Sequence, residues 1–286
     1  MGYGSLKPQS LRGEPRGGRA DARIGGNLEC DDASSSGTRR PAGVSCGSTC
    51  RILTLFYFST NFPTLPEFRS EGEVRLLGAK IGFLSGAMME NLRIFTEQQS
   101  NANSASIKGS IYFGSGFQAE GTVELVNAEV TISVSCARGK LSTEEGKALN
   151  LDGLRTGDVF LTNGFAAKGE VRLVGAKING QLVCSGGSFR NAKGRALNLA
   201  SATVGDSVML SNRFEAEGEI SLAAAKVGGD VRLTYANLSS GAETTLDAEG
   251  LSITHGLYLD KLTLGSQTKI RLCGAHARTL FQACIS

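Results

Sequence analysis

The sequence lacks most of the features that identify a familiar class of protein. It contains no Trp and only 5 Pro among 286 residues, so neither a collagen-like chain nor a Pro-rich linker is indicated. Its strongest apolar run, residues 52–58, is far shorter than the roughly 20 residues that a membrane-spanning helix needs. Residues 1–22 contain no apolar stretch of the kind that marks a secretory signal. These absences favour a soluble chain.

Charge and cysteine content limit the partners that the chain is expected to bind and the cellular compartment in which it is expected to lie. The 30 Lys and Arg residues against 27 Asp and Glu give a net charge of +3, too small to indicate specific nucleic-acid binding. Residues 1–22 are predicted to form a mobile basic tail, which makes an anionic membrane surface an alternative partner. Seven Cys, an odd number without a signal, favour free thiols in the cytoplasm, with the membrane periphery as the alternative location. Cys46 and Cys50 lack the second ligand pair of a zinc site.

Internal repetition is the dominant feature of the chain. Four similar phrases, FRSEGEVRLLGAKIG, FQAEGTVELVNAEVT, FAAKGEVRLVGAKING and FEAEGEISLAAAKVGG, begin at Phe68, Phe117, Phe165 and Phe214, at spacings of 49, 48 and 49 residues. A second phrase, such as ALNLDGLRTGDVFL from Ala148, lies between them and aligns with the first kind. The repeating unit is therefore about 24 residues, and the longer period contains two units.

The pattern inside each unit predicts strands. Apolar residues alternate with others, as in Val171 and Leu173, and Gly, Asn, Asp and Ser mark the turns. We therefore predict an all-β fold: a single-stranded parallel β-helix, or β-solenoid, right-handed, with about 24 residues per coil. Nine or ten coils are expected, each rising about 4.8 Å. A single coil cannot bury its apolar edge, so stability has to come from stacking.

Three groups of residues are expected to hold the coils together. The predicted aromatic ladder at one corner of the interior consists of Phe68, Phe117, Phe165 and Phe214. The cysteines expected in one shared inward register, as small buried hydrophobes, are Cys30, Cys136 and Cys184. The glycines expected at tight corners are Gly72, Gly121, Gly169 and Gly218.

The repeat is uneven toward both ends. Residues 31–67 do not fit, so 23–67 are predicted to be degraded first coils with an irregular insertion. Residues 88–95, MMENLRIF, are expected to form a helical turn or a short helix outside the rod. Residues 68–286 form the predicted solenoid, whose last phrase lacks a cap. This favours a continuation in a longer parent protein over an end that pairs with a partner.

Residues that carry chemistry are few and scattered. Asp158, Asp206 and Asp230 each follow Gly in three coils, and stacked acids on a solenoid face can bind calcium or transfer protons. Asn27 and Gln181 hold the corresponding position in other coils, which makes the column polar rather than acidic.

The remaining candidates also have structural readings. His255 and His276, the only histidines, are predicted at turns without catalytic partners. Glu170 and Glu219 are expected to form ion pairs with arginines such as Arg172 across coils. Phosphate-loop and dinucleotide-binding glycine motifs are missing. The sequence therefore predicts no catalytic residue, no metal site and no cofactor.

The phrases GEVRLVGAKINGQLVCSGGSF and ALNLDGLRTGDVFLTNGFAAKGE resemble a group of uncharacterised bacterial β-solenoid repeat proteins. The resemblance covers about residues 68–275 and a fragment near Ile24. Some members carry the label membrane-associated oxidoreductase, but no flavin, nicotinamide, haem or iron–sulfur signature accompanies the repeat here. Bactofilin-type polymers, which are small β-solenoids that join end to end, are a looser analogy.

Three functions are compatible with these observations. The favoured hypothesis is a non-catalytic scaffold or protein-binding rod in a bacterial cell, which contacts partners or itself through its faces or ends. The alternatives are an oxidoreductase or carbohydrate-active enzyme on a β-helix, and a self-polymerising element.

Overall fold

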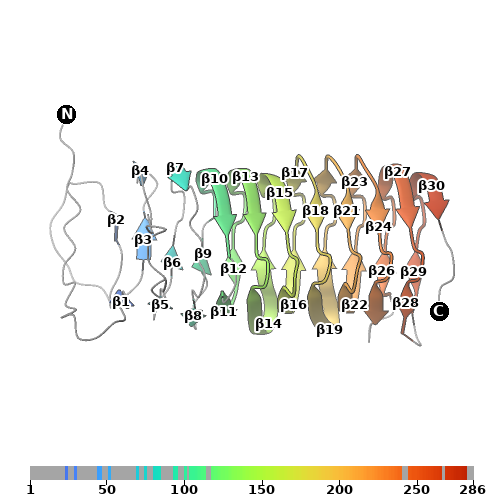
Figure 1. Ribbon diagram of the computed structural model, residues 1–286, viewed down its shortest axis with the longest axis horizontal. Helices are drawn as coiled ribbons and strands as arrows, with labels where there is room; N and C mark the ends of the chain where they lie inside the picture. The colour runs from blue at the N-terminus through green and yellow to red at the C-terminus, as the bar shows by residue number, and fades with distance from the viewer. Residues whose placement is uncertain are drawn as a thin grey trace.

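The computed structural model is a rod of stacked β-coils (Figure 1). The structure describes residues 103–113, 117–239, 244–265 and 268–281, and before them only short strands between Arg23 and Asn101. Every regular element in these residues is a strand, and partner strands are parallel. The prediction of an all-β parallel solenoid is confirmed; the described residues form about seven turns, against the nine or ten expected for the whole chain.

The strands form two sheets that run the length of the rod. The first sheet contains β1 (Arg23–Ile24), β2 (Glu29–Cys30), β3 (Val44–Cys46), β5 (Arg69–Ser70), β6 (Val74–Arg75), β8 (Arg93–Phe95), β9 (Ser100–Asn101), β11 (Gln118–Glu120), β12 (Val123–Glu124), β14 (Lys140–Asn150), β16 (Ala166–Arg172), β19 (Ser188–Asn198), β22 (Glu215–Ser221), β25 (Asn237–Ser239), β26 (Leu246–Asp247), β28 (Thr263–Leu264) and β29 (Ile270–Arg271). The second sheet contains β4 (Arg51–Ile52), β7 (Lys80–Leu84), β10 (Ser106–Tyr112), β13 (Glu129–Ser135), β15 (Arg155–Phe160), β17 (Lys177–Ile178), β18 (Leu182–Val183), β20 (Thr203–Val204), β21 (Val208–Met209), β23 (Lys226–Val227), β24 (Val231–Arg232), β27 (Ser252–Tyr258) and β30 (His276–Phe281).

Coil length alternates along the first sheet. One column of paired residues passes through Val123, Leu149, Val171, Leu197, Ile220, Leu246 and Ile270. The intervals between these residues are 26, 22, 26, 23, 26 and 24 residues. The predicted 24-residue unit is thus the average of longer and shorter coils. The longer coils include the 11-residue strands β14 and β19.

Tight turns join the two sheets at both edges. In one coil, the Ala176 amide donates to the Leu173 carbonyl (3.1 Å) at one edge, and the Gly187 amide donates to the Cys184 carbonyl (3.0 Å) at the other. Each turn contains a residue in the left-handed backbone region, which Gly and Asn tolerate best. At the first edge these residues are Ser104, Asn127, Gly153, Gly175, Ser201, Ala224, Gly250 and Gly274.

The interior is one continuous apolar cluster whose packing alternates from coil to coil. Just before the first-sheet strand, successive coils hold Phe117, Gly139, Phe165, Gly187, Phe214, Ala236 and Leu262. Two positions later, the same coils hold Ala119, Leu141, Ala167, Phe189, Ala216, Leu238 and Leu264. A coil with Phe at the first position therefore has Ala at the second, and a coil with Gly at the first has Leu or Phe at the second.

From Phe117 to Leu238, this alternation keeps one large side chain per coil at these two positions, whereas the last described coil holds two, Leu262 and Leu264. The Phe189 ring lies between those of Phe165 and Phe214, with centroid distances of 5.3 and 5.1 Å, and all three are fully buried. A Cβ atom on Gly187 would lie 2.8 Å from both the Phe189 ring and the Leu161 carbonyl oxygen. The small residue is therefore required beside the large one.

The expected ladder contains an additional member. Phe117, Phe165 and Phe214 are buried at the corner, as expected. Phe189 is also buried there, in the coil between Phe165 and Phe214, but it comes from the second of the two corner positions. Phe68 lies outside the described residues.

The glycine corners are partly described. Gly121, Gly169 and Gly218 have φ values of 107°, 121° and 129°, in the region where a side chain is strained. Gly72 lies outside the described residues, as do residues 1–22.

Three expectations need correction or stay open near the N-terminal end. Cys30 belongs to β2 of the first sheet and pairs with Cys46, so it does not share the second-sheet register of Cys136 and Cys184. Within the segment expected to be helical, Arg93–Phe95 form β8, because they pair in register with neighbouring first-sheet strands. Most of residues 31–67 lie outside the described residues, so the irregular insertion stays a prediction.

Replacement of Phe189 by Ala is expected to lower the free energy of unfolding by about 3–5 kcal/mol, because Gly187 leaves nothing to fill the cavity. The matched control is Phe160→Ala, which removes the same ring from an outward position and is expected to cost less than about 1 kcal/mol. Chemical denaturation of both variants measures the difference. Equal losses of unfolding free energy in the two variants would contradict the tight packing described for this corner.

Candidate functional site

The three aspartates considered in the sequence, Asp158, Asp206 and Asp230, lie where the strands of the second sheet are interrupted. At Gly157, Gly205 and Gly228, an added Cβ atom would overlap a backbone carbonyl oxygen of the preceding coil, so only glycine fits this close approach. Beyond this break the sheet resumes with β18, β21 and β24. The amide groups that follow the break need acceptors, and polar side chains supply several of them.

Two of the three aspartates act as such acceptors. Asp158 Oδ1 accepts a hydrogen bond from the Gln181 amide (2.9 Å), and Asp230 Oδ1 accepts one from the Gly256 amide (3.0 Å). Asp206 lies one position earlier, two residues before Val208, so Ser207 takes the place in the column that directly precedes the strand. The three carboxylates therefore do not form one column, and two of them hold the next coil in place.

The electrostatics of Asp230 also point to a structural role. Arg232 Nη2 lies 2.8 Å from Asp230 Oδ2, and this hydrogen bond is the main cause of the lowered pKa of the Asp230 carboxyl group. Partial desolvation opposes the shift. A carboxylate held ionised by an adjacent guanidinium is a poor general acid near neutral pH. Asp230 is thus suited to fastening coils rather than to proton transfer.

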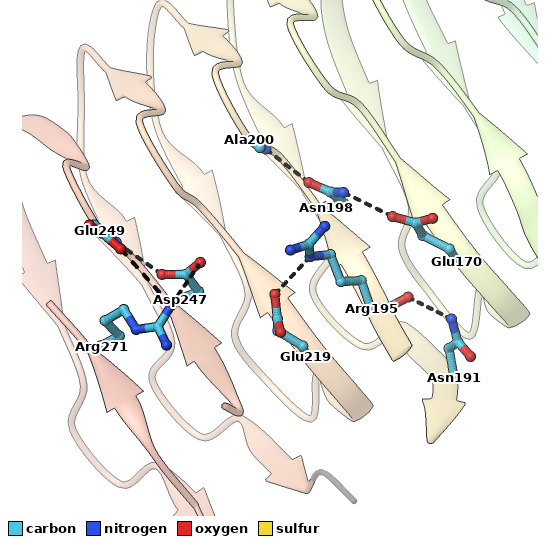
Figure 2. Close-up of polar contacts among 9 residues, drawn as sticks. All are labelled: Glu170, Asn191, Arg195, Asn198, Ala200, Glu219, Asp247, Glu249 and Arg271. Atoms are coloured by element: carbon cyan, nitrogen blue, oxygen red, sulfur yellow. Dashed lines mark hydrogen bonds and ion pairs between the residues drawn. The ribbon is translucent and has the colours of Figure 1, made fainter. Parts of the chain in front are cut away.

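A second polar group covers the first sheet near its edge (Figure 2). Asn198 is 1% exposed; its Nδ2 donates to Glu170 Oε1 (2.9 Å) in the preceding coil, and its Oδ1 accepts from the Ala200 amide (3.1 Å). Asn150 makes the same kind of bond to the Asp152 amide (3.3 Å) two coils earlier. The asparagines thereby satisfy backbone donors at the turn, as Asx turns do.

Ion pairs continue this group along the rod. Arg195 Nε donates to Glu219 Oε1 at 2.7 Å, and Arg271 Nη1 lies 3.9 Å from Asp247 Oδ2 and from Glu249 Oε2 (Figure 2). The hydrogen bond that Arg195 donates to Glu219 raises the pKa of the Arg195 guanidinium. Glu219 thus forms the expected ion pair across coils, whereas Glu170 accepts from Asn198 and the Arg172 guanidinium contacts Asp152 at 2.5 Å.

The other predicted candidates stay apart from one another. His255 lies at the interruption of the second sheet, and His276 begins β30; both are exposed. Cys136 and Cys184 are fully buried, two coils apart, with Leu161 in the coil between them. In the part of the chain that the structure describes, no three His, Cys, Asp or Glu side chains are grouped so as to hold a metal ion.

A surface feature that the sequence reading missed lies on the second sheet. A column of outward positions, here called the outer row, runs past the interruption through Tyr112, Ser135, Phe160, Val183, Met209, Arg232 and Tyr258. Its inward neighbours, such as Val159 and Leu161, are fully buried, so the row faces outward. The sequence does contain a sign of this row. A large apolar residue recurs every 48 or 49 positions, one position away from the residues of the buried pattern.

Comparisons with protein-family models, with curated proteins and with solved structures found no match. Among the described residues, no helix is long and apolar enough to cross a membrane. The family resemblance of the repeat therefore stays a prediction.

The buried thiols are expected to be unreactive in the folded protein. Burial raises the pKa of the Cys136 thiol to about 12 and also raises that of Cys184, so almost no thiolate is present at pH 8. Iodoacetamide at that pH is expected to modify the exposed Cys273 quickly and the other two only after unfolding. Peptide mass spectrometry follows each site. Modification of Cys136 at the rate of Cys273 under native conditions would contradict this packing.

The carboxyl group of Asp230 is expected to make the stability of the fold depend on pH in the acidic range. Its lowered pKa adds stability that is present above the unfolded value of about 4 and is lost as pH falls through the folded pKa. Asp230→Asn keeps an acceptor oxygen for Gly256 but removes the charge. We expect a loss below about 1 kcal/mol at pH 7, because the pair is partly exposed to solvent, and convergence with the parent in acid.

Asp230→Ala serves as the comparison, since it also removes the acceptor for the Gly256 amide. Its deficit is expected to persist at low pH. Thermal unfolding between pH 7 and pH 3 measures both variants. A constant difference between Asp230→Asn and the parent over this range would contradict the role of the Arg232 pair.

Proposed function

We propose that the chain is a non-catalytic β-solenoid scaffold, a stiff rod whose faces bind partner proteins. The observation that carries the proposal is the use of its reactive side chains as fasteners between coils. Asp158 and Asp230 accept backbone amides of the following coil, and Glu170 and Glu219 are bound by Asn198 and Arg195. An active site needs groups that converge on a substrate atom. These groups converge on the protein's own backbone and on one another.

The shape supports the same proposal. Stacked coils create long faces on which each surface position recurs at about 4.8 Å intervals along the axis. Such a face presents a long series of similar contacts along the axis, which suits an extended partner better than a small molecule. Small-molecule sites are concave and few.

Site-specific photo-crosslinking in the cells that produce the chain tests this role. A photoreactive amino acid is placed, one position at a time, on outward residues of the first sheet (Lys168, Glu217), of the second sheet (Thr203, Ser252) and at the corner residue Lys193. A scaffold is expected to yield the same crosslinked protein from neighbouring coils of one face. Absence of a protein crosslink at all five positions would contradict the proposal.

A further inference from the structure

The outer row has a regular relief. Its large apolar members recur every second coil, and smaller residues lie between the first three. The large apolar members are Tyr112, Phe160, Met209 and Tyr258. Ser135 and Val183 lie between the first three, and Arg232, whose guanidinium lies 4.4 Å from the centroid of the Tyr258 ring, lies between the last two. Because each coil rises about 4.8 Å, the large side chains are about 9.6 Å apart along the axis. The row is therefore a line of apolar ridges with shallow gaps, on a face whose strands β10, β13, β15, β18, β21, β24 and β27 lie side by side in Figure 1.

The face around the row is basic. From turn to turn, its eight described coil segments carry nine Lys and Arg against five Asp and Glu, a net charge of +4. The segments are 105–113, 128–138, 154–164, 176–186, 202–213, 225–235, 251–261 and 275–281. Exposed cations flank the row on both sides: Lys177 and Lys226 begin second-sheet strands, and Arg213 lies in the turn beyond Met209. Two of the five acids, Asp158 and Asp230, already accept backbone amides.

The first sheet does not share this charge. Between its turns, the described segments carry nine Lys and Arg against eleven Asp and Glu, a net charge of −2. Several of these, including Glu219 and Arg195, neutralise one another. The positive field is therefore concentrated on the side of the rod that bears the outer row, and it favours an acidic partner.

The spacing of the ridges favours a helix over an extended strand. Residues seven apart on one face of an α-helix are separated by about 10.5 Å, close to the axial spacing of about 9.6 Å in the outer row. Side chains on one face of a strand repeat at about 6.6 Å, which matches neither one coil nor two. A helix laid along the rod thus places one apolar side chain in each gap, for example beside Ser135 and Val183.

Two other occupants fit less well. A second copy packed through the same face would place basic rows opposite basic rows, which is unfavourable. A lipid surface would require several projecting apolar side chains together. The exposed ones on this sheet, Tyr112, Ile132 and Leu280, lie singly in three different coils, and Phe160, Val183, Met209 and Tyr258 are only partly exposed.

We propose that the outer face of the second sheet binds an acidic amphipathic helix of a partner protein, laid along the rod axis. Apolar residues of the helix sit between the ridges of the outer row, and its Glu or Asp residues contact the flanking cations. The proposal rests on the binding-rod function above, and it adds the face, the orientation and the chemistry of the partner.

Two synthetic peptides of three heptads test it with the full chain. Both have the same Leu face, and all other positions are Glu in one and Lys in the other. Fluorescence anisotropy at low and physiological salt is expected to show binding of the Glu peptide only, weaker at the higher salt. Phe160→Ser with Met209→Ser, and separately Lys177→Glu with Arg213→Glu, are each expected to weaken binding at least about tenfold.

The matched control is Lys140→Glu with Lys168→Glu, the same charge change on the first sheet, which is expected to alter binding less than about twofold. Circular dichroism confirms that each variant retains its strands. Failure of the Glu peptide to bind, equal binding of the Lys peptide, or an equal loss in the control would overturn the proposal.

Two further measurements identify the competing occupants. Binding to phosphatidylglycerol vesicles that requires Lys177 and Arg213, without binding of the Glu peptide, would overturn the proposal in favour of lipid. Self-association in sedimentation that requires Phe160 and Met209 would overturn it in favour of a second copy. Crosslinks confined to the first sheet would contradict helix binding by the second sheet but leave the scaffold function intact. Absence of crosslinks at every position would contradict both proposals.

Discussion

The height available to each coil is the constraint on which the structure depends. Hydrogen bonding between parallel coils fixes their separation at about 4.8 Å, which leaves room for one large ring per coil at the two first-sheet positions of the interior corner. The chain meets this limit by placing the ring alternately at two strand positions. Phe165, Phe189 and Phe214 stack at centroid distances of 5.1 to 5.3 Å because Gly187 vacates the position beside the middle ring. The two-coil period of the sequence follows from this packing.

The same period organises the surface. Coils with Gly at the interior corner include the longer strands β14 and β19, and the Asn150 and Asn198 turns recur with them. Large apolar residues of the outer row recur at the same interval on the second sheet. A polymeric or helical partner with a repeat near two coils therefore meets an identical contact at each step. This is why we assign binding to a face rather than to a pocket.

The sequence predicted the solenoid because alternation, turn residues and repeat length all pointed to one fold. It did not predict the place of Phe189, because that residue lies between the two repeating phrases, after the first ends and before the second begins at Ala196. Single-residue differences between coils were the other source of error. Asp206 lies two residues before Val208 rather than one, which moves its carboxylate out of the column, and a strand's register decides which face a side chain occupies. The outer row was missed for the same reason, since it differs from the buried pattern by one position.

Deletion of whole repeats tests the two-coil packing most directly. Removal of residues 166–214 joins Phe165 to Glu215 and preserves the alternation, so we expect cooperative unfolding with a melting temperature near that of the parent. Removal of residues 166–187 joins Phe165 to Ser188, which places Phe165 and Phe189 in one coil and overfills the corner. That shorter deletion is expected to unfold at a clearly lower temperature despite losing fewer residues. Equal stability of the two deletions would contradict the account.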